Sequence, residues 1–166
     1  MTDLEVVVAG GGNAALCAAI TARENGAAVT LFESAPRSMR GGNTRHTRNL
    51  RASHIGPLET LEESYSEDEF WDDILKVTQG NTDEKLTHLM IKQSSSLMSW
   101  LKERDVHFQP ALSGTLSLHR TNAFFLGGGK TLLNKLYSHA EKIGVKVRYD
   151  SEITSVSISN NRAHSI

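Results

Sequence analysis

Residues 4–33 read LEVVVAGGGNAALCAAITARENGAAVTLFE, and this stretch decides the fold. Residues 4–9 form a short apolar run around three valines, which is typical of a strand buried on both faces of a parallel sheet. The alanine-rich residues 14–25 have helical spacing, Gly26 suits the position just past a helix end, and residues 28–33 predict a second strand. The stretch therefore predicts a β-α-β unit in an α/β chain.

The loop between the first predicted strand and the helix has the glycine pattern of a dinucleotide-binding site. Gly10 permits the tight turn, Gly12 lets the backbone approach a diphosphate, and Ala15 lets the helix pack close to the strand. The helix N-terminus offers amides and a positive dipole end to the phosphates. Glu33 can accept hydrogen bonds from ribose hydroxyls, and its charge disfavours NADP. The alternative, an ordinary tight turn with Glu33 at the surface, does not explain why these features coincide.

A second glycine-rich segment, Gly41-Gly42-Asn43-Thr44, begins eight residues past Glu33. If this loop lies beside the first one, its amides and the Thr44 hydroxyl can contact an extended diphosphate or a flavin ring. That arrangement favours FAD over NAD. From spacing alone, a glycine-rich surface turn explains the segment equally well.

Residues 35–57 are expected to form an ordered loop, and two packing helices are expected to follow it. Ser66 and Glu69 form a capping box, with Tyr65 and Phe70 as a hydrophobic staple, at the start of the first helix. Asn81 repeats the cap at the start of a longer helix. The longer helix is expected to pack through its regularly spaced apolar residues, which are Leu86, Leu89, Met90, Leu97 and Leu101.

The last part of the chain predicts a return to the sheet. Glycines 127–129 open a helix that ends at Gly144, and alternating apolar residues at 145–149 predict a third strand. Residues 153–159 are extended, Asn160-Asn161 suits a hairpin turn, and residues 162–166 would be the returning strand.

The overall prediction is an incomplete, Rossmann-like FAD-binding domain of the α/β class, with a parallel sheet, a helical insertion and the start of an antiparallel hairpin. We expect a nucleotide-binding β-α-β part at 1–57, the helical insertion at 58–122, and the return helix and strands at 123–166. Because the chain stops inside a hairpin arm, we expect it to be the N-terminal part of a longer protein.

Composition excludes several classes of function. The 166 residues carry 18 Lys and Arg against 19 Asp and Glu, so the net charge of -1 gives no general attraction to nucleic acid. The single cysteine, Cys17, rules out an internal disulfide and a cysteine-rich metal cluster, and we expect no metal. No run is apolar enough to span a bilayer, and acidic residues near the N-terminus argue against a secretory signal. We therefore expect a cytoplasmic protein.

The sequence resembles the flavoprotein subunits of the fumarate reductase and succinate dehydrogenase superfamily. The resemblance begins in the stretch quoted above, which continues into RGGNTRHTRNLR at 40–51. Three later stretches resemble in particular the FAD-dependent tricarballylate dehydrogenases: YSEDEFWDDILKVTQGNTDEKL, FQPALSGTLSLHRTNAFFLGGGKTLLNKLY and AEKIGVKVRYDSEIT. The resemblance covers nearly the whole chain but only the N-terminal portion of those proteins, and it implies FAD as the cofactor.

Carried over position by position, the resemblance implies where FAD is bound. It assigns the first loop to the diphosphate, the end of the second strand to the ribose, the second loop to the flavin side, and a later backbone segment to the adenine. These residues are Gly10, Gly12, Asn13, Ala14 and Ala15, then Glu33 and Ser34, then Gly41, Gly42, Asn43 and Thr44, and finally Ile153. Some relatives attach FAD to a histidine in the second loop, where this chain has Asn43. We expect non-covalent FAD, with attachment to His46 as the alternative.

The resemblance further implies the oxidation of a tricarboxylate C–C bond to the alkene, from tricarballylate to cis-aconitate, with hydride transfer to the flavin. Such a substrate needs several fixed cations, and residues 34–58 contain five arginines and no acid. The candidate substrate-binding residues are Arg48, Arg51, Arg120 and Asn122, and the alternative for each is a surface contact. We find no convincing general base, so no catalytic residue is assigned.

The family also implies a membrane-associated iron–sulfur or haem protein that accepts electrons, which would hold the chain at the inner face of the membrane. Two other functions compete with the tricarballylate prediction. One is a fumarate reductase or succinate dehydrogenase type of flavoprotein. The other is a non-catalytic FAD-binding fragment, which the abrupt end at Ile166 favours.

Overall fold

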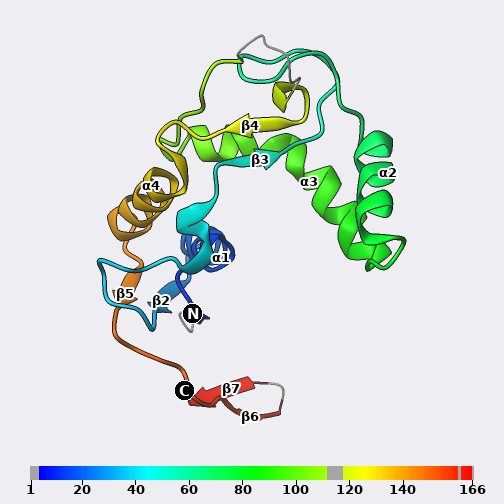
Figure 1. Cartoon of the computed structure of the whole chain (residues 1–166). Helices are drawn as coiled ribbons and strands as arrows, with labels where there is room; N and C mark the ends of the chain where they lie inside the picture. The colour runs from blue at the N-terminus through cyan, green and yellow to red at the C-terminus, as the bar shows by residue number, and fades with distance from the viewer. Residues whose placement is uncertain (1–3, 112–117, 161, 166) are drawn as a thin grey trace. The chain divides into compact units, whose positions relative to one another are not determined.

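The computed structural model describes residues 4–111, 118–160 and 162–165, and the chain divides into two compact units. The first unit comprises Met1–His46 and Leu133–Ile166, and the second comprises Thr47–Leu132. Figure 1 traces both units along the chain from the N-terminus to the C-terminus.

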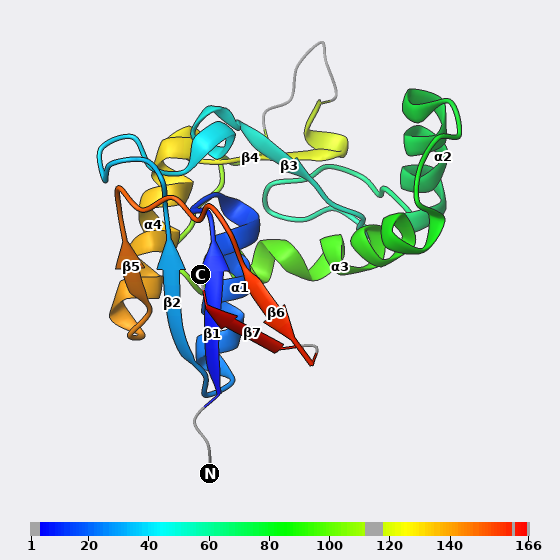
Figure 2. The same cartoon turned by 90° about the horizontal axis from the view of Figure 1, so that it is seen from below.

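The first unit contains a three-stranded parallel sheet with the strand order β1-β2-β5 (Figure 2). Its elements are β1 (Glu5–Ala9), α1 (Asn13–Glu24), β2 (Ala28–Phe32) and β5 (Lys146–Arg148). Helix α1 packs on β1 and β2, and its Leu16 and Ile20 side chains are fully buried. Gly26, just past the helix end, has a φ of +90°. The predicted β-α-β unit is therefore confirmed, as is the parallel sheet.

The predicted return helix and hairpin are also present. They are α4 (Gly128–Lys142), β6 (Ser157–Ser159) and β7 (Arg162–Ser165), and β6 pairs with β7 in antiparallel fashion. Asn160 has a φ of +51°, as its predicted place in a hairpin turn requires, whereas Asn161 lies outside the described residues. The strand β6 is shorter than predicted. The sequence predicts an extended run over residues 153–159, but residues 153–156 pair with no strand among the described residues.

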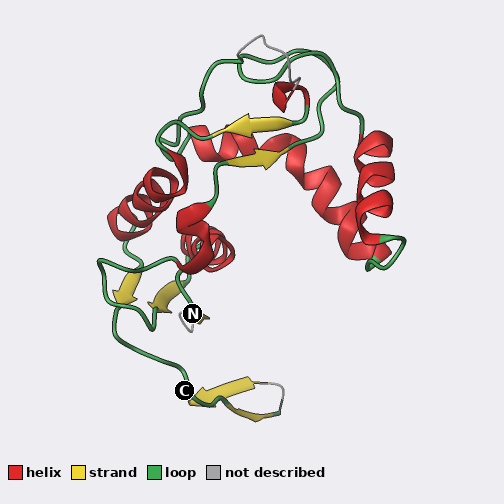
Figure 3. Ribbon diagram, in the orientation of Figure 1, coloured by secondary structure: helices red, strands yellow, loops and turns green. Residues whose placement is uncertain are grey.

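The second unit combines a short antiparallel strand pair with two helices (Figure 3). Its elements are β3 (Asn49–Arg51), α2 (Glu67–Thr78), α3 (Glu84–Lys102), the 3-10 helix η2 (Leu118–Arg120) and β4 (Asn122–Phe124). The prediction of a simple loop over residues 35–57 was wrong. That segment contains the 3-10 helix η1 (Gly42–His46) and β3, and the partner strand β4 lies too far along the chain for a local pattern to reveal it.

Helix α2 begins as the sequence predicts. The Ser66 side chain accepts a hydrogen bond from the Glu69 amide, and the Tyr65 and Phe70 rings pack with their centroids 5.2 Å apart. Both rings are buried together with Ile91 of α3. The capping box is only half formed, however, because the Glu69 carboxylate pairs with the Arg120 guanidinium.

Helix α3 differs from its prediction in its cap and in its buried face. Asp83, not Asn81, is the N-cap, and its carboxylate accepts from the Leu86 amide at 2.9 Å. The buried residues are Thr87, Ile91, Ser94, Met98 and Leu101, whereas Leu86, Leu89 and Met90 are exposed. The buried stripe includes hydroxyl residues that bond to backbone atoms: the Ser94 hydroxyl accepts from the amide of Ser53. A hydrophobicity pattern assigns such positions to solvent. The prediction was therefore wrong for Leu86, Leu89 and Met90, whereas the predicted Leu101 is buried and Leu97 is half-buried.

Substitution can test which of the two residues, Asp83 or Asn81, caps α3. We expect Asp83→Ala to lower the free energy of unfolding by about 1 kcal/mol, because the first-turn amide of α3 loses its acceptor. Asn81→Ala serves as the matched control and is expected to have little effect. Denaturant unfolding of both variants checks this, and equal losses would contradict the assignment of Asp83 as the cap.

Candidate functional site

The first glycine loop, residues 10–12, connects β1 to α1 in the first unit. Gly10 continues the sheet by donating to the Phe32 carbonyl at 2.7 Å, and its φ of +95° is one that only glycine adopts readily. A Cβ added to Gly10 would meet no protein atom within 4 Å, so this part of the loop faces open space. Gly12 is the N-cap of α1. The amides of Ala14 and Ala15, in the first turn of α1, have no acceptor within the helix and can bind an anion.

The second glycine loop lies directly beside the first. The amide of Asn13 donates to the Thr44 hydroxyl at 3.1 Å. A Cβ on Gly12 would lie 3.3 Å from the same hydroxyl oxygen and 3.7 Å from the Gly41 carbonyl oxygen. The sequence left open whether residues 41–44 are a surface turn or a close-approach loop. The hydrogen bond from Asn13 and the closeness of Gly12 place them against the first glycine loop.

Glu33, at the end of β2, contacts both glycine loops. Its side chain is buried, and its two carboxylate oxygens accept from the amides of Ala35 and Gly41, each at 3.0 Å. The Ser34 hydroxyl also donates to the Glu33 carboxylate, at 3.5 Å. A carboxylate has about four acceptor positions, so these three bonds leave one position for a ribose hydroxyl. Glu33 is therefore a structural link as well as a candidate cofactor ligand.

Two glycines have a steric role that the sequence pattern does not reveal. A Cβ on Gly11 would collide with the Tyr137 hydroxyl and the Glu33 carboxylate. Gly41 combines a φ of +97° with a Leu133 side chain that occupies the space of any Cβ. The sequence pattern does not identify Gly11 or Tyr137, because the two residues are 126 positions apart and meet only in the folded protein.

The remaining predicted cofactor residues have different environments. Asn13 is half-buried, and its side-chain oxygen is buried without a hydrogen-bond partner. Ala15 and Ile153 are half-buried. The others are exposed, and they are Ala14, Ser34, Gly42, Asn43 and His46. An orphaned amide oxygen and a Gly10 backbone that opens to space are consistent with a site that receives a ligand at this loop.

The predicted substrate residues all lie in the second unit, and three of them are engaged within it. Arg51 donates to the Asp73 carboxylate and to the Tyr65 hydroxyl, both at 3.2 Å. Arg120 forms ion pairs with Glu63 and Glu69.

These contacts define the electrostatics of the second unit. Burial and the Asp73 carboxylate raise the pKa of Tyr65 to about 12, and the hydrogen bond to Glu69 raises the pKa of Arg120. The side-chain amide of Asn122 donates to the Thr121 hydroxyl at 2.7 Å. Arg48 is exposed, and its side chain has no partner among the described residues. Arg48 is therefore the cation of this set that is available to an anion.

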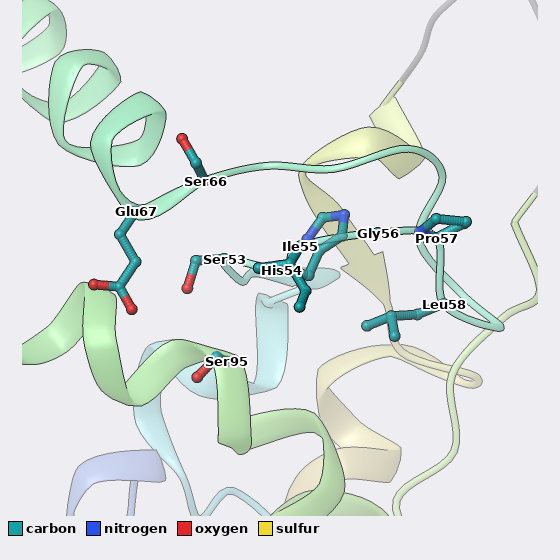
Figure 4. A pocket seen from close by; sticks show the side chains of 9 residues that line it. All are labelled: Ser53, His54, Ile55, Gly56, Pro57, Leu58, Ser66, Glu67 and Ser95. Carbon is teal, nitrogen blue, oxygen red and sulfur yellow. The ribbon is translucent and has the colours of Figure 1, made fainter.

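The second unit also contains an open cavity of about 530 Å³ (Figure 4). Its lining residues are Ser53, His54, Ile55, Gly56, Pro57, Leu58, Ser66, Glu67 and Ser95. The ring nitrogens of His54 face the carbonyl oxygens of Ala52 and Glu62, at 3.0 and 3.4 Å. None of the described lining residues is a lysine or arginine, and Glu67 adds a negative charge, so the cavity does not suit a polycarboxylate.

The described part of the chain has neither a metal-binding cluster nor a helix suited to a bilayer. No group of three or more His, Cys, Asp or Glu side chains there is arranged to hold a metal ion. No helix formed by those residues combines the length and apolar character needed to cross a membrane.

Comparison with known proteins identifies the family of the chain. The profile of the family described as FAD binding domain matches residues 5–166. The chain belongs to this family. FAD is therefore the cofactor of this domain, and the membership supports the part of the resemblance that concerns the fumarate reductase and succinate dehydrogenase superfamily.

One curated relative of this FAD binding domain is the NADH:fumarate oxidoreductase of Klebsiella pneumoniae. It is 25% identical over 172 residues, which cover 98% of this chain and 18% of the relative. The chain thus spans about a fifth of the length of that protein.

Solved structures share the fold. A 3-ketosteroid-Δ4-(5α)-dehydrogenase from Rhodococcus jostii superposes with a TM-score of 0.73 at 22% identity, over 89% of this chain and 38% of that one. The Mycobacterium smegmatis Sdh1 complex gives 0.73 at 16%, over 98% and 30%. The Escherichia coli quinol fumarate reductase gives 0.70 at 12%, over 96% and 28%. These neighbours support the predicted fold class of an FAD-binding domain.

The steric difference between adjacent glycines gives a direct test of the site geometry. We expect Gly11→Ala to destabilise the apoprotein by roughly 1–3 kcal/mol, because the new methyl group overlaps buried side chains. Gly12→Ala is the control: its φ of -80° is ordinary and its Cβ would be only tightly packed, so the loss is expected to be small. Denaturant unfolding measures both, and a Gly11→Ala variant as stable as Gly12→Ala would contradict this packing.

Proposed function

We propose that this chain is the FAD-binding part of an oxidoreductase that interconverts a C–C single bond and a double bond in a polycarboxylate, with tricarballylate and cis-aconitate as the substrate pair. The observation that supports it best is the hydrogen bond between the two glycine loops, from Asn13 to Thr44. Glu33 accepts a hydrogen bond from Gly41 of the second loop and packs against Gly11 of the first. That arrangement suits an extended dinucleotide carrying a flavin. Bound FAD would accept the hydride that leaves the substrate.

Named residues would hold the cofactor in this proposal. The Gly10–Ala15 segment offers backbone amides and the positive end of the α1 dipole to the diphosphate. The Asn13 amide can turn so that its NH2 group faces a phosphate oxygen. Glu33 and Ser34 would meet the ribose, residues 41–44 the flavin side, and Ile153 the adenine.

The substrate-binding part of the proposal rests on Arg48. Among the candidates, Arg51 and Arg120 are already paired with carboxylates, whereas the Arg48 guanidinium is exposed and unpaired within the described residues. A guanidinium can hold a carboxylate with two parallel hydrogen bonds. Arg51, Arg120 and Asn122 would join the site only if the substrate displaced their present partners.

A second substrate class has support of its own. The Klebsiella relative is a fumarate oxidoreductase, and one similar fold belongs to a quinol fumarate reductase. Fumarate and succinate are dicarboxylates, so one fixed cation fewer would suffice for them. The similar fold in the Sdh1 complex supports a further proposal, that reduced flavin passes electrons to an iron–sulfur or haem protein at the membrane.

The substrate test uses the protein at its native length, purified from its source. We expect tricarballylate, added without oxygen, to bleach the visible absorption band of the bound flavin, because hydride transfer reduces it. Succinate serves as the matched dicarboxylate control. Bleaching by succinate alone would replace tricarballylate with the fumarate reductase alternative, and bleaching by neither would favour a non-catalytic FAD-binding function.

Arg48 has its own prediction. We expect Arg48→Gln to raise the KM of the native-length enzyme for its polycarboxylate by roughly ten- to a hundredfold, because one charge-assisted hydrogen bond is worth about 1.5–3 kcal/mol. The control is Arg37→Gln, since Arg37 is also exposed but lies 3.9 Å from the Glu141 carboxylate. Steady-state kinetics checks both variants, and an unchanged KM in Arg48→Gln would exclude this role.

A further inference from the structure

Tyr137, on helix α4, is in direct contact with the phosphate-binding loop. Its hydroxyl donates to the Gly11 carbonyl oxygen at 2.9 Å, and its side chain is almost fully buried. The Gly11 carbonyl lies inside the fold, and the sequence separation of 126 residues makes this bond a link between the two ends of the first unit. Neither the glycine pattern nor the family resemblance assigned a role to Tyr137.

The geometry of the peptide bond connects this contact to the cofactor. In a trans peptide the C=O and the following N–H point in opposite directions. Because Tyr137 holds the Gly11 carbonyl toward the core, the N–H of Gly12 must point away from it. No hydrogen bond from the Gly12 N–H is present among the described residues. The amide is thus aimed outward and available at the loop that opens to space at Gly10.

We propose that Tyr137 is a positioning residue for FAD, which fixes the peptide between Gly11 and Gly12 so that the Gly12 amide donates to the cofactor diphosphate. This inference rests on FAD binding by the two glycine loops and adds a residue to that site. Tyr137 itself does not touch the cofactor. It acts through the Gly11 carbonyl, and for that it must be held in place and must stay protonated.

Both conditions are met. The Arg40 guanidinium lies over the Tyr137 ring, 4.5 Å from its centroid, and donates to the Asn134 side chain at 2.9 Å. Burial raises the pKa of Tyr137, and the neighbouring Glu33 carboxylate raises it further. A raised pKa favours the protonated hydroxyl, which is the form that donates to the Gly11 carbonyl oxygen.

The same residues connect Tyr137 to the second loop. Arg40 directly precedes Gly41, whose amide donates to the Glu33 carboxylate. A Cβ on Gly11 would contact both Tyr137 and Glu33, so these three residues form one packed group. Tyr137 thus lies beside the first loop and beside Glu33, which is hydrogen-bonded to the second loop.

The test compares two tyrosine-to-phenylalanine variants of the native-length protein, each freed of its cofactor. Tyr137→Phe keeps the buried ring and removes the donor. Tyr149→Phe is the matched control, because the Tyr149 ring packs 6.1 Å from that of Tyr137 while its hydroxyl donates only to Glu141 at 3.4 Å. We expect the dissociation constants for FAD and for ADP to rise together by about three- to tenfold in Tyr137→Phe and to stay unchanged in Tyr149→Phe.

A second measurement needs no variant and tests directly whether the Gly12 amide donates to the cofactor. Hydrogen exchange at the Gly12 amide of the wild-type chain should slow when ADP binds, since that amide then donates to a phosphate. Unchanged exchange at Gly12 in the ADP complex would overturn the inference, and so would wild-type affinities in Tyr137→Phe. A wild-type chain that binds neither FAD nor ADP would instead overturn the two-loop site itself, and the inference with it.

Discussion

The buried carboxylate of Glu33 is the interaction on which the first unit depends. It accepts hydrogen bonds from the amide of Ala35, just after β2, and from the amide of Gly41 in the second glycine loop. Together with the Tyr137 hydroxyl, it leaves no room for a side chain at Gly11 of the first loop. A buried carboxylate is costly unless it is hydrogen-bonded. The fold meets this cost by bringing two backbone amides to it, and doing so brings both glycine loops to one place.

This arrangement explains why glycine is required at positions of different kinds. Gly10 and Gly41 have positive φ values that other residues adopt only with strain. Gly11 is needed for space, because the Tyr137 hydroxyl and the Glu33 carboxylate occupy the position of a Cβ. Gly12 has an ordinary backbone conformation and fits closely against Thr44. A glycine-rich motif therefore combines conformational, steric and ligand-related constraints that its spacing alone does not distinguish.

The local pattern was enough to predict the β-α-β unit and the return helix of the first unit, and the start of α2 in the second. A short valine run, a capping serine and a glycine past a helix end each act through neighbours in sequence, so they can be read there. The packing of α3 could not be read in this way. Its buried face includes Thr87 and Ser94, because backbone atoms of another segment satisfy the Ser94 hydroxyl. Likewise, β3 depends on a partner strand far along the chain.

The ion pairs of the arginines also depend on contacts between segments that are far apart in the sequence. Residues 34–58 contain five arginines and no acid, whereas residues 59–84 contain ten acids and one lysine. In the second unit, acids from that region pair with two of the arginines: Asp73 with Arg51 and Glu69 with Arg120. Part of the asymmetry is thus neutralised within the protein, and exposed ion pairs of this kind add little stability. Of the three arginines proposed to bind substrate, Arg48 is the one whose guanidinium has no partner among the described residues, and composition alone could not distinguish it.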